Sequence, residues 1–214
     1  MTEDEWLRCG DPLRMLRQLR ADSHSRKALL LTAACCFRVW DHLPEHCRSW
    51  VRLLEDAAEG RANPQRLNDD WEDVEDTLGR LSFNEYPNHA DGKYAALIEM
   101  LCVYWEANDV PPDPNPKART YTTERKAYAA LVRDVYGNPF RPASVDPTWL
   151  AWNEGTVPRI AQAIYDERAF ERMPILADAL EDAGCDNADI LNHCRQPSVH
   201  VRGCWVVDLL LGKE

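Results

Sequence analysis

The chain has 214 residues, and its 36 acidic against 25 basic side chains give a formal net charge of −11. Affinity for a nucleic-acid backbone comes mainly from lysine and arginine, so this balance argues against a nucleic-acid-binding protein. Hydrophobic residues make up 45% and charged residues 29% of the chain, which is typical of a soluble folded protein and argues against overall disorder.

The N-terminus and the cysteines indicate a cytoplasmic protein. Met1 to Glu5 is acidic and no apolar stretch follows it, so no secretory signal is expected. Ala28 to Phe37 is largely apolar but too short to cross a bilayer, and we expect no membrane contact. The eight cysteines are dispersed through helical patterns in a chain large enough to fold without disulfides, so free and mostly buried thiols are predicted.

Capping residues predict four helices in the first part of the chain. At each predicted helix start, a proline or a serine stands at a position where it stabilises the first turn. Apolar residues follow it three or four positions apart. The helices are expected to start at Asp11-Pro12, after Ser23 or Ser25, at Pro44, and at Asn63-Pro64, the last one running to Leu78.

The middle of the chain is predicted to contain a domain boundary. A strongly apolar helix is expected from Tyr94 to Trp105. Val110 to Pro116 then contains four prolines in seven residues, which excludes a helix there. We therefore predict two helical lobes, residues 1–109 and 120–214, joined by a Pro-rich linker at 110–119, with a single domain as the alternative.

Helical patterns resume after the linker. Thr122 or Thr123 caps a helix that Gly137 ends, and an irregular stretch is expected before Thr156. Further helices are expected from Thr156, over Met173 to Ala183, after Asp186 or Asn187, and over about Val201 to Leu211. No apolar–polar alternation is long enough for a strand, so the predicted fold class is all-α, a compact multi-helix bundle or a short helical array.

Both ends of the chain resemble a family of uncharacterised bacterial proteins. The N-terminal resemblance lies in Glu5-Trp6-Leu7, Asp11-Pro12, Met15-Leu16 and the stretch from Ser25-Arg26-Lys27 to Ala34-Cys35-Cys36. The C-terminal resemblance lies in Gly137 to Pro142, Ala161 to Phe170, Pro174 to Cys185 and His200 to Trp205. The middle departs from the family, which often has an alanine-rich helical stretch there. The resemblance implies an α-helical fold and no activity.

The stretch His42-Leu43-Pro44-Glu45-His46 matches the H-x-x-E-H string of inverted zinc proteases. That chemistry needs both histidines one turn apart on the same helix. Proline inside a helix costs about 3 kcal/mol, so Pro44 is predicted to start a helix and to leave His42 in the preceding loop. We therefore interpret these five residues as part of a surface turn.

A second group of candidate ligands lies near the C-terminus. It contains soft ligands that could enclose a structural zinc ion, Cys185, His193, Cys194, His200 and Cys204. Their spacing is looser than in a zinc knuckle. If Val201 to Leu211 is a helix, Cys204 lies on its apolar face and packs in the core. We therefore predict no metal or cofactor and keep zinc at these residues as the alternative.

Two other patterns favour structural roles. Cys35 and Cys36 precede His46 and could form a reactive thiol pair with it, but they lie within an apolar helix where a small hydrophobic side chain fits. The acidic run from Asp69 to Asp76 could bind Ca²⁺ or Mg²⁺. It lacks the glycine of a calcium loop and alternates with apolar residues, so a solvated helix face is predicted.

The chain contains no Walker phosphate loop, no G-x-S-x-G elbow and no G-x-G-x-x-G fingerprint. We therefore favour a non-catalytic helical module that presents an acidic surface to a protein partner, a basic one in the simplest case. Two alternatives stay open: a metal-dependent or thiol enzyme that uses the Cys and His groups above, and a small-molecule-binding protein with a cavity between its helices. No catalytic residue and no oligomeric state is predicted.

Overall fold

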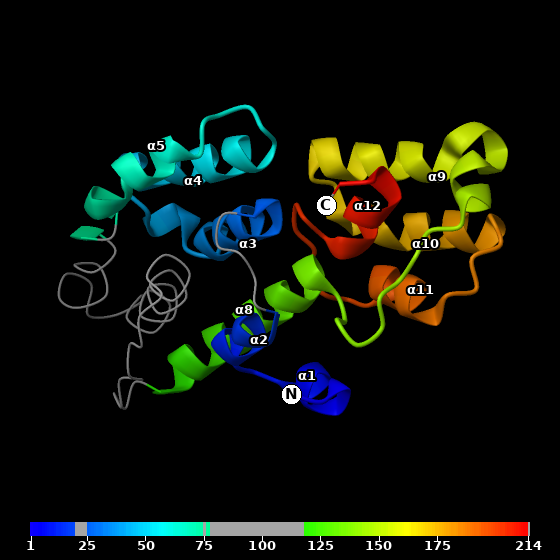
Figure 1. Cartoon of the computed structure of the whole chain (residues 1–214), viewed down its shortest axis with the longest axis horizontal. Coiled ribbons are helices and arrows are strands. Elements are labelled where there is room, and N and C mark those ends of the chain that lie inside the picture. Colours follow the sequence, from blue (N-terminus) through cyan, green and yellow to red (C-terminus); the bar gives the residue numbers. More distant parts are fainter. Residues whose placement is uncertain (20–24, 75, 78–117, 214) are drawn as a thin grey trace. The chain divides into compact units, whose positions relative to one another are not determined.

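The computed structural model describes residues 1–19, 25–74, 76–77 and 118–213, and all regular structure in these ranges is helical (Figure 1). The predicted all-α class is therefore confirmed. Contacts divide the chain into two compact units, residues 1–132 and 133–214. None of the described helices combines the length and the apolar character that crossing a bilayer would need.

The four helices predicted for the N-terminal unit begin where the capping residues indicate. The elements are α1 (Glu3–Arg8), α2 (Pro12–Leu19), α3 (Arg26–Phe37), the 3-10 turn η1 (Trp40–His42), α4 (Glu45–Ala58) and α5 (Gln65–Asp69). Asp11 Oδ1 accepts the amides of Leu13 and Arg14 at the start of α2, and Ser25 Oγ accepts the amide of Ala28 at the start of α3. Helix α1 was not predicted, although Thr2 and Glu5 form a capping box there.

Helix α3 is the centre of the N-terminal core. Its residues from Ala28 to Cys36 are all buried, and α4 packs against it. Trp50 on α4 is 1% exposed and donates its indole N–H to the backbone oxygen of Leu67 at 3.1 Å. This core is built almost wholly from apolar side chains.

The helix predicted from Pro64 to Leu78 is not continuous. Helix α5 ends at Asp69, the chain turns at Asp70, and residues 71–74 start a further helical stretch. In an unbroken helix the carbonyl of Leu67 would accept the amide of Trp71. Here the Trp50 indole binds that carbonyl, which supplies a tertiary reason for the break.

Two predictions for the middle of the chain lie outside the described residues. They are the helix from Tyr94 to Trp105 and the proline-rich part of the linker, Val110 to Pro116. Helix α8 (Ala118–Tyr136) begins inside the predicted linker and contains the boundary between the two units. Lobes that end at 109 and begin at 120 therefore stay a prediction.

The C-terminal unit is a series of short helices around one core. After α8 come α9 (Pro147–Glu167), the 3-10 turn η2 (Phe170–Arg172), α10 (Met173–Asp182), α11 (Ala188–Arg195) and α12 (Trp205–Leu211). Helix α9 packs against α10 and α12, and α10 packs against α11 (Figure 1). The core includes the fully buried side chains of Val157, Ile164, Leu176, Ile190 and Val207.

Helix α9 begins nine residues before the predicted start at Thr156. Asp146 accepts the amide of Thr148 at 2.8 Å, so Asp146-Pro147 starts a helix in the same way as Asp11-Pro12. The helix is interrupted at residues 152–155, where Asn153, Glu154 and Gly155 adopt left-handed conformations. This interruption shifts the apolar periodicity and explains why the first part was predicted to be irregular.

The last helix begins later than predicted. Helix α12 starts at Trp205, and the residues before it form a turn in which Gly203 has φ of +92°. The prediction that Val201 to Leu211 is helical is therefore wrong for its first four residues. Cys204 is the N-cap of α12, and its side chain is buried in the apolar core of the unit.

A buried polar quartet as candidate metal centre

The end of α8, helix α11 and the turn before α12 bring four buried polar side chains together. Asp134, His193, His200 and Cys204 each offer one ligand atom, and these four atoms lie within 4.8 Å of one another. We call this group the quartet. Its members are between 0 and 9% exposed. Polar side chains that are removed from water are stable only when they have hydrogen-bonding or ionic partners, so the burial of four of them together needs a physical explanation.

Asp134 is the hub of the quartet. Its Oδ1 lies 2.6 Å from His200 Nδ1 and 3.2 Å from His193 Nε2, and its Oδ2 accepts the amide of Val201 at 2.9 Å. Burial by itself raises the pKa of this carboxyl group, but the hydrogen bonds and charges of the two histidines outweigh burial and hold the pKa below its usual value. Asp134 is therefore a carboxylate at neutral pH.

Cys204 completes the quartet as a soft ligand. Its Sγ lies 3.2 Å from His193 Nε2 and 4.0 Å from His200 Nδ1. Burial, and then the negative charge of Asp134, raise the pKa of this thiol well above its usual value, while the backbone amides of Val206 and Val207 act against the rise. Without a cation nearby, Cys204 is a neutral thiol; a bound metal ion would stabilise the thiolate.

Aromatic packing fixes the two imidazole rings. Their centroids lie 4.8 Å apart in an edge-on arrangement, and the ring of Trp205 lies 5.1 Å from that of His193. Trp205 also packs on Gly137, where a Cβ atom would come within 3.1 Å of the indole. Gly137, with φ of +67°, ends α8 three residues after Asp134, so only glycine allows both this turn and this contact without strain.

The quartet includes three of the five candidate ligands identified in the sequence. His193, His200 and Cys204 belong to it, whereas Cys185 and Cys194 do not, and both of these thiols pack in the apolar core. Burial, with smaller contributions from Cys185 and Asp134, raises the pKa of Cys194 to about 12. Cys204 is buried in the core, as predicted, but it is the N-cap of α12 and does not lie within that helix.

Asp134 was missed by sequence reasoning. The sequence feature that could have identified Asp134 is an acidic residue among the apolar positions of a helix. Leu131 and Val135, one helical turn apart, lie on either side of it and are both buried. A carboxylate on the buried face of a helix needs a partner. The partners, His193 and His200, are far away in the sequence, so local spacing could not identify them.

The H-x-x-E-H string does not form a zinc protease site. His42 lies in η1, Pro44 precedes the first residue of α4, and His46 lies on α4, so the two histidines are not on one helix. The effect predicted for Pro44 is confirmed. His46 Nε2 instead makes a hydrogen bond with Thr77 Oγ1 at 3.0 Å.

The cysteines of α3 and α4 are core residues. Cys35, Cys36 and Cys47 are at most 1% exposed, and none of the seven cysteines of the described ranges is in a disulfide. Burial raises the pKa of Cys36 far above its usual value and that of Cys47 to about 11. A reactive thiol needs a lowered pKa, so Cys36 and Cys47 lack that property.

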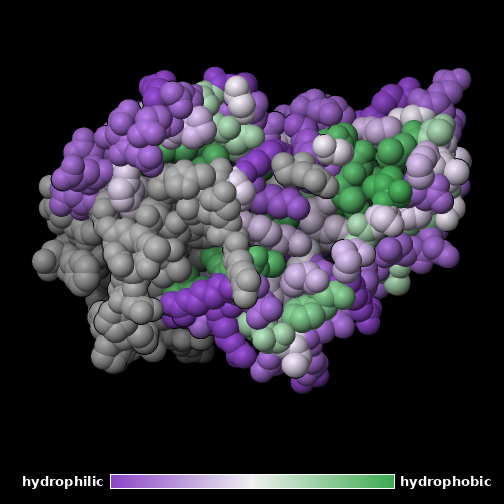
Figure 2. All heavy atoms as spheres, viewed as in Figure 1, coloured by the Kyte–Doolittle hydropathy of each residue, from purple (hydrophilic) through white to green (hydrophobic). Residues whose placement is uncertain are grey.

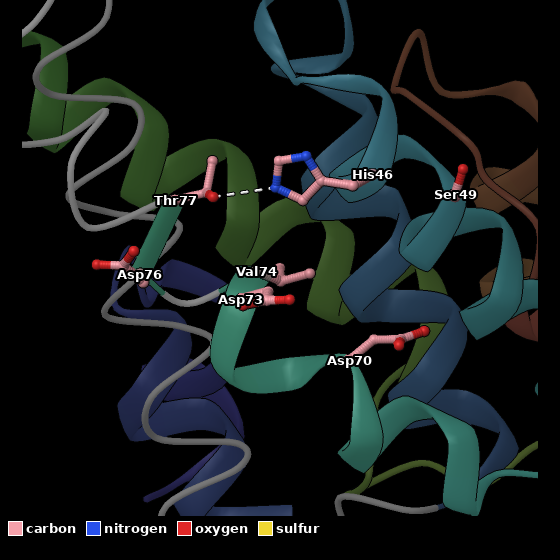
Figure 3. Close-up of a pocket in the computed structure, with 7 residues that line it drawn as sticks. All are labelled: His46, Ser49, Asp70, Asp73, Val74, Asp76 and Thr77. Carbon is pink, nitrogen blue, oxygen red and sulfur yellow. Dashed lines mark hydrogen bonds between the residues drawn. The ribbon is translucent and has the colours of Figure 1, made fainter.

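A second candidate site is a pocket on the N-terminal unit, of about 540 Å³ (Figure 3). His46 and Ser49 of α4 form one side, and Asp70, Asp73 and Val74 form the other, with Thr77 bonded to His46. Asp76 also lines it, and the described lining residues include no lysine or arginine. The quartet is the only close group of potential metal ligands in the part of the chain that the structure describes, and it does not include these aspartates.

The acidic run is a solvated surface, as predicted. Asp69, Asp70, Glu72, Asp73 and Asp76 are all exposed. Hydrophilic side chains cover the visible face of α4 and α5 (Figure 2).

Comparisons with protein-family models, with curated proteins and with solved structures give no match to this chain. The resemblance of the two chain ends to uncharacterised bacterial proteins therefore stays a prediction.

Proposed function

We propose that this protein is a non-catalytic helical module whose C-terminal unit holds one structural Zn²⁺ ion through Asp134, His193, His200 and Cys204. One observation carries the proposal: four buried side chains of the types that bind zinc place their ligand atoms within 4.8 Å of one another. Zinc in structural sites takes four ligands in a tetrahedron, drawn from thiolate, imidazole and carboxylate.

The charges of the quartet suit a divalent ion. Neutral imidazoles contribute no charge, while the Asp134 carboxylate and the Cys204 thiolate contribute one negative charge each. A divalent cation would make the buried group neutral overall, which removes the large cost of an uncompensated charge in the core. The nitrogen and sulfur ligands favour zinc over Ca²⁺ and Mg²⁺, which prefer oxygen.

The burial of the quartet favours a structural ion over a catalytic one. Catalytic zinc and non-haem iron sites keep a coordination position open for water or substrate. Here four protein side chains supply the full tetrahedral set, and none of them lines the pocket between His46 and Asp73. At such a site the ion would contribute to folding and supply no chemistry.

Ser198, His200 and Asp134 have the connectivity of a hydrolase triad. Ser198 Oγ lies 3.3 Å from His200 Nε2, and His200 Nδ1 lies 2.6 Å from Asp134 Oδ1. That interpretation leaves His193 and Cys204 unexplained, although both lie 4 Å or less from the same groups. Zinc binding uses all four buried side chains, and we therefore favour it.

A cytoplasmic location fits this proposal. A reducing compartment keeps Cys204 available as a thiolate ligand, whereas an oxidising one favours disulfides. The free state of the described cysteines supports the same assignment.

The test is the zinc content of the full chain, purified without a polyhistidine tag and measured by elemental analysis. We expect one zinc ion per chain in the wild type and in Cys185→Ala, a buried cysteine outside the quartet, and little or none in Cys204→Ala. Circular dichroism establishes that each variant is folded. A folded wild type without zinc, after refolding with equimolar zinc, would contradict the proposal.

The acidic pocket supports a second role, the binding of a basic protein segment. Three of its described lining residues, Asp70, Asp73 and Asp76, are acidic, and the chain carries a net charge of −11. Opposite charge steers association and makes it sensitive to salt. A lysine-rich peptide should bind the wild type more tightly than Asp70→Asn/Asp73→Asn, and equal affinities at low salt would exclude this role for the pocket.

A further inference from the structure

The two histidines of the quartet face it through different ring nitrogens. His193 directs Nε2 toward Asp134 Oδ1 and Cys204 Sγ, both at 3.2 Å, whereas His200 directs Nδ1 toward Asp134 Oδ1 at 2.6 Å. Each ring therefore has its other nitrogen directed away from the quartet. An ion in the quartet would be bound by one Nε2 atom and one Nδ1 atom.

Each outward nitrogen has a polar partner from the same short segment. His193 Nδ1 lies 3.2 Å from the side-chain amide nitrogen of Gln196, Nε2, and His200 Nε2 lies 3.3 Å from Ser198 Oγ. Gln196 is the C-cap of α11, and Ser198 follows two residues later. Both residues are exposed, so they reach the buried rings from the surface.

We propose that Gln196 and Ser198 are the positioning residues of the zinc site. Gln196 holds the ring proton of His193 on Nδ1, and Ser198 holds that of His200 on Nε2, which leaves His193 Nε2 and His200 Nδ1 to bind the ion. This inference rests on the proposed zinc site and adds which surface side chains orient its ligands.

The chemistry requires a hydrogen-bond acceptor at both positions. An imidazole that binds a metal through one nitrogen carries its proton on the other, and a partner for that proton fixes the ring and strengthens the ligand. Ser198 Oγ accepts such a proton directly. Gln196 accepts it after its side-chain amide rotates by half a turn and presents Oε1 in place of the nitrogen.

This requirement separates two substitutions of Gln196. Gln196→Ala removes the acceptor, whereas Gln196→Glu keeps an acceptor and adds negative charge beside the proton of His193. If the outward nitrogen of His193 instead accepted a proton from Gln196, glutamate would fail as alanine does. Ser198→Ala and Ser198→Thr form the equivalent pair at His200. Val199, which lies beside Ser198 and is 62% exposed, provides the control Val199→Ala.

The experiment is a chelator-competition titration of Zn²⁺ with the full chain. Loss of an outer partner typically weakens metal affinity by about 10- to 100-fold. We expect Gln196→Ala and Ser198→Ala each to bind zinc at least about tenfold more weakly than the wild type. Gln196→Glu, Ser198→Thr and Val199→Ala should bind it about as tightly as the wild type, or more tightly in the case of Gln196→Glu.

A second measurement tests the ring nitrogens themselves. In the ¹⁵N-histidine NMR spectrum of the zinc-bound chain, we expect one ligand histidine protonated on Nδ1 and the other on Nε2. Two histidines bound through the same type of nitrogen would overturn the inference, and so would alanine variants that match Val199→Ala in affinity. A wild type that binds no zinc would overturn the proposed function itself, before any variant is compared.

Discussion

The small cores of the two units are stabilised in different ways. In the N-terminal unit, α3 places a run of apolar side chains in the core, with Leu29, Leu30 and Leu31 at most 2% exposed. In the C-terminal unit, a carboxylate, two imidazoles and a thiol lie beside an apolar cluster. Apolar burial stabilises without a partner, whereas a buried polar group stabilises only when its partners are complete.

The comparison predicts that zinc matters to one unit and not to the other. Structural zinc contributes an apparent binding free energy of about 10–16 kcal/mol in small domains, far more than any side chain. Removal of zinc by a strong chelator should therefore increase amide hydrogen exchange in α11 and α12 by orders of magnitude and leave α3 unchanged. Equal increases in α3 and α12 would show that the units do not differ in this way.

The second prediction concerns the N-terminal core, in which a substitution would create a cavity. Trp50→Ala removes a fully buried indole and its hydrogen bond to Leu67, and substitutions of this kind cost about 3–5 kcal/mol of unfolding free energy. We expect chemical denaturation of this variant to show that loss, with the zinc content still at one ion per chain. A simultaneous loss of zinc would indicate that the two cores are coupled.

The pH dependence of zinc binding tests whether the Cys204 thiolate is a zinc ligand. Burial and the charge of Asp134 keep the pKa of this thiol high in the metal-free chain, so zinc must displace its proton. A proton that is released on binding makes affinity rise with pH, by about tenfold per pH unit for each proton. Between pH 6 and 7.5 we expect the zinc affinity of the wild type to rise more steeply than the weak residual affinity of Cys204→Ala. Parallel profiles in the chelator titration would exclude the thiolate as a ligand.

The smallest effect is expected at Gly137. A methyl group there meets the Trp205 ring at 3.1 Å and strains a residue with φ of +67°. Overpacking of this kind costs about 1–3 kcal/mol. Gly137→Ala should lower the stability of the C-terminal unit by that amount, measured by urea unfolding followed through Trp205 fluorescence in a Trp-reduced background. Gly60→Ala, where a Cβ atom meets nothing within 4 Å, is the matched control at a positive φ.

Much of the fold could be predicted from local chemistry. Asp11, Ser25 and Asn187 each cap a helix at the predicted position, because a cap depends only on residues two or three positions away. Some of the wrong predictions also concern local caps, at the starts of α1 and α9. Others involve distant groups: the break after α5 involves the Trp50 indole, and the turn that delays α12 holds His200 and Cys204 of the quartet.

The candidate site could be predicted only in part, for the same reason. His193, His200 and Cys204 come from a short stretch rich in soft ligands, which composition alone reveals. Asp134 lies 66 residues from His200 in the sequence, and no periodicity relates them. Gln196 and Ser198 look like ordinary surface residues until the orientation of the two rings is known.

The interruption in α9 gives this long helix an internal weak point. Three successive left-handed residues, Asn153 to Gly155, break the ladder of hydrogen bonds that would make α9 a single cooperative segment. The two parts of α9 can therefore fray separately. Under mechanical load or limited proteolysis, α9 should yield first at residues 152–155, within the helix, and not at its ends.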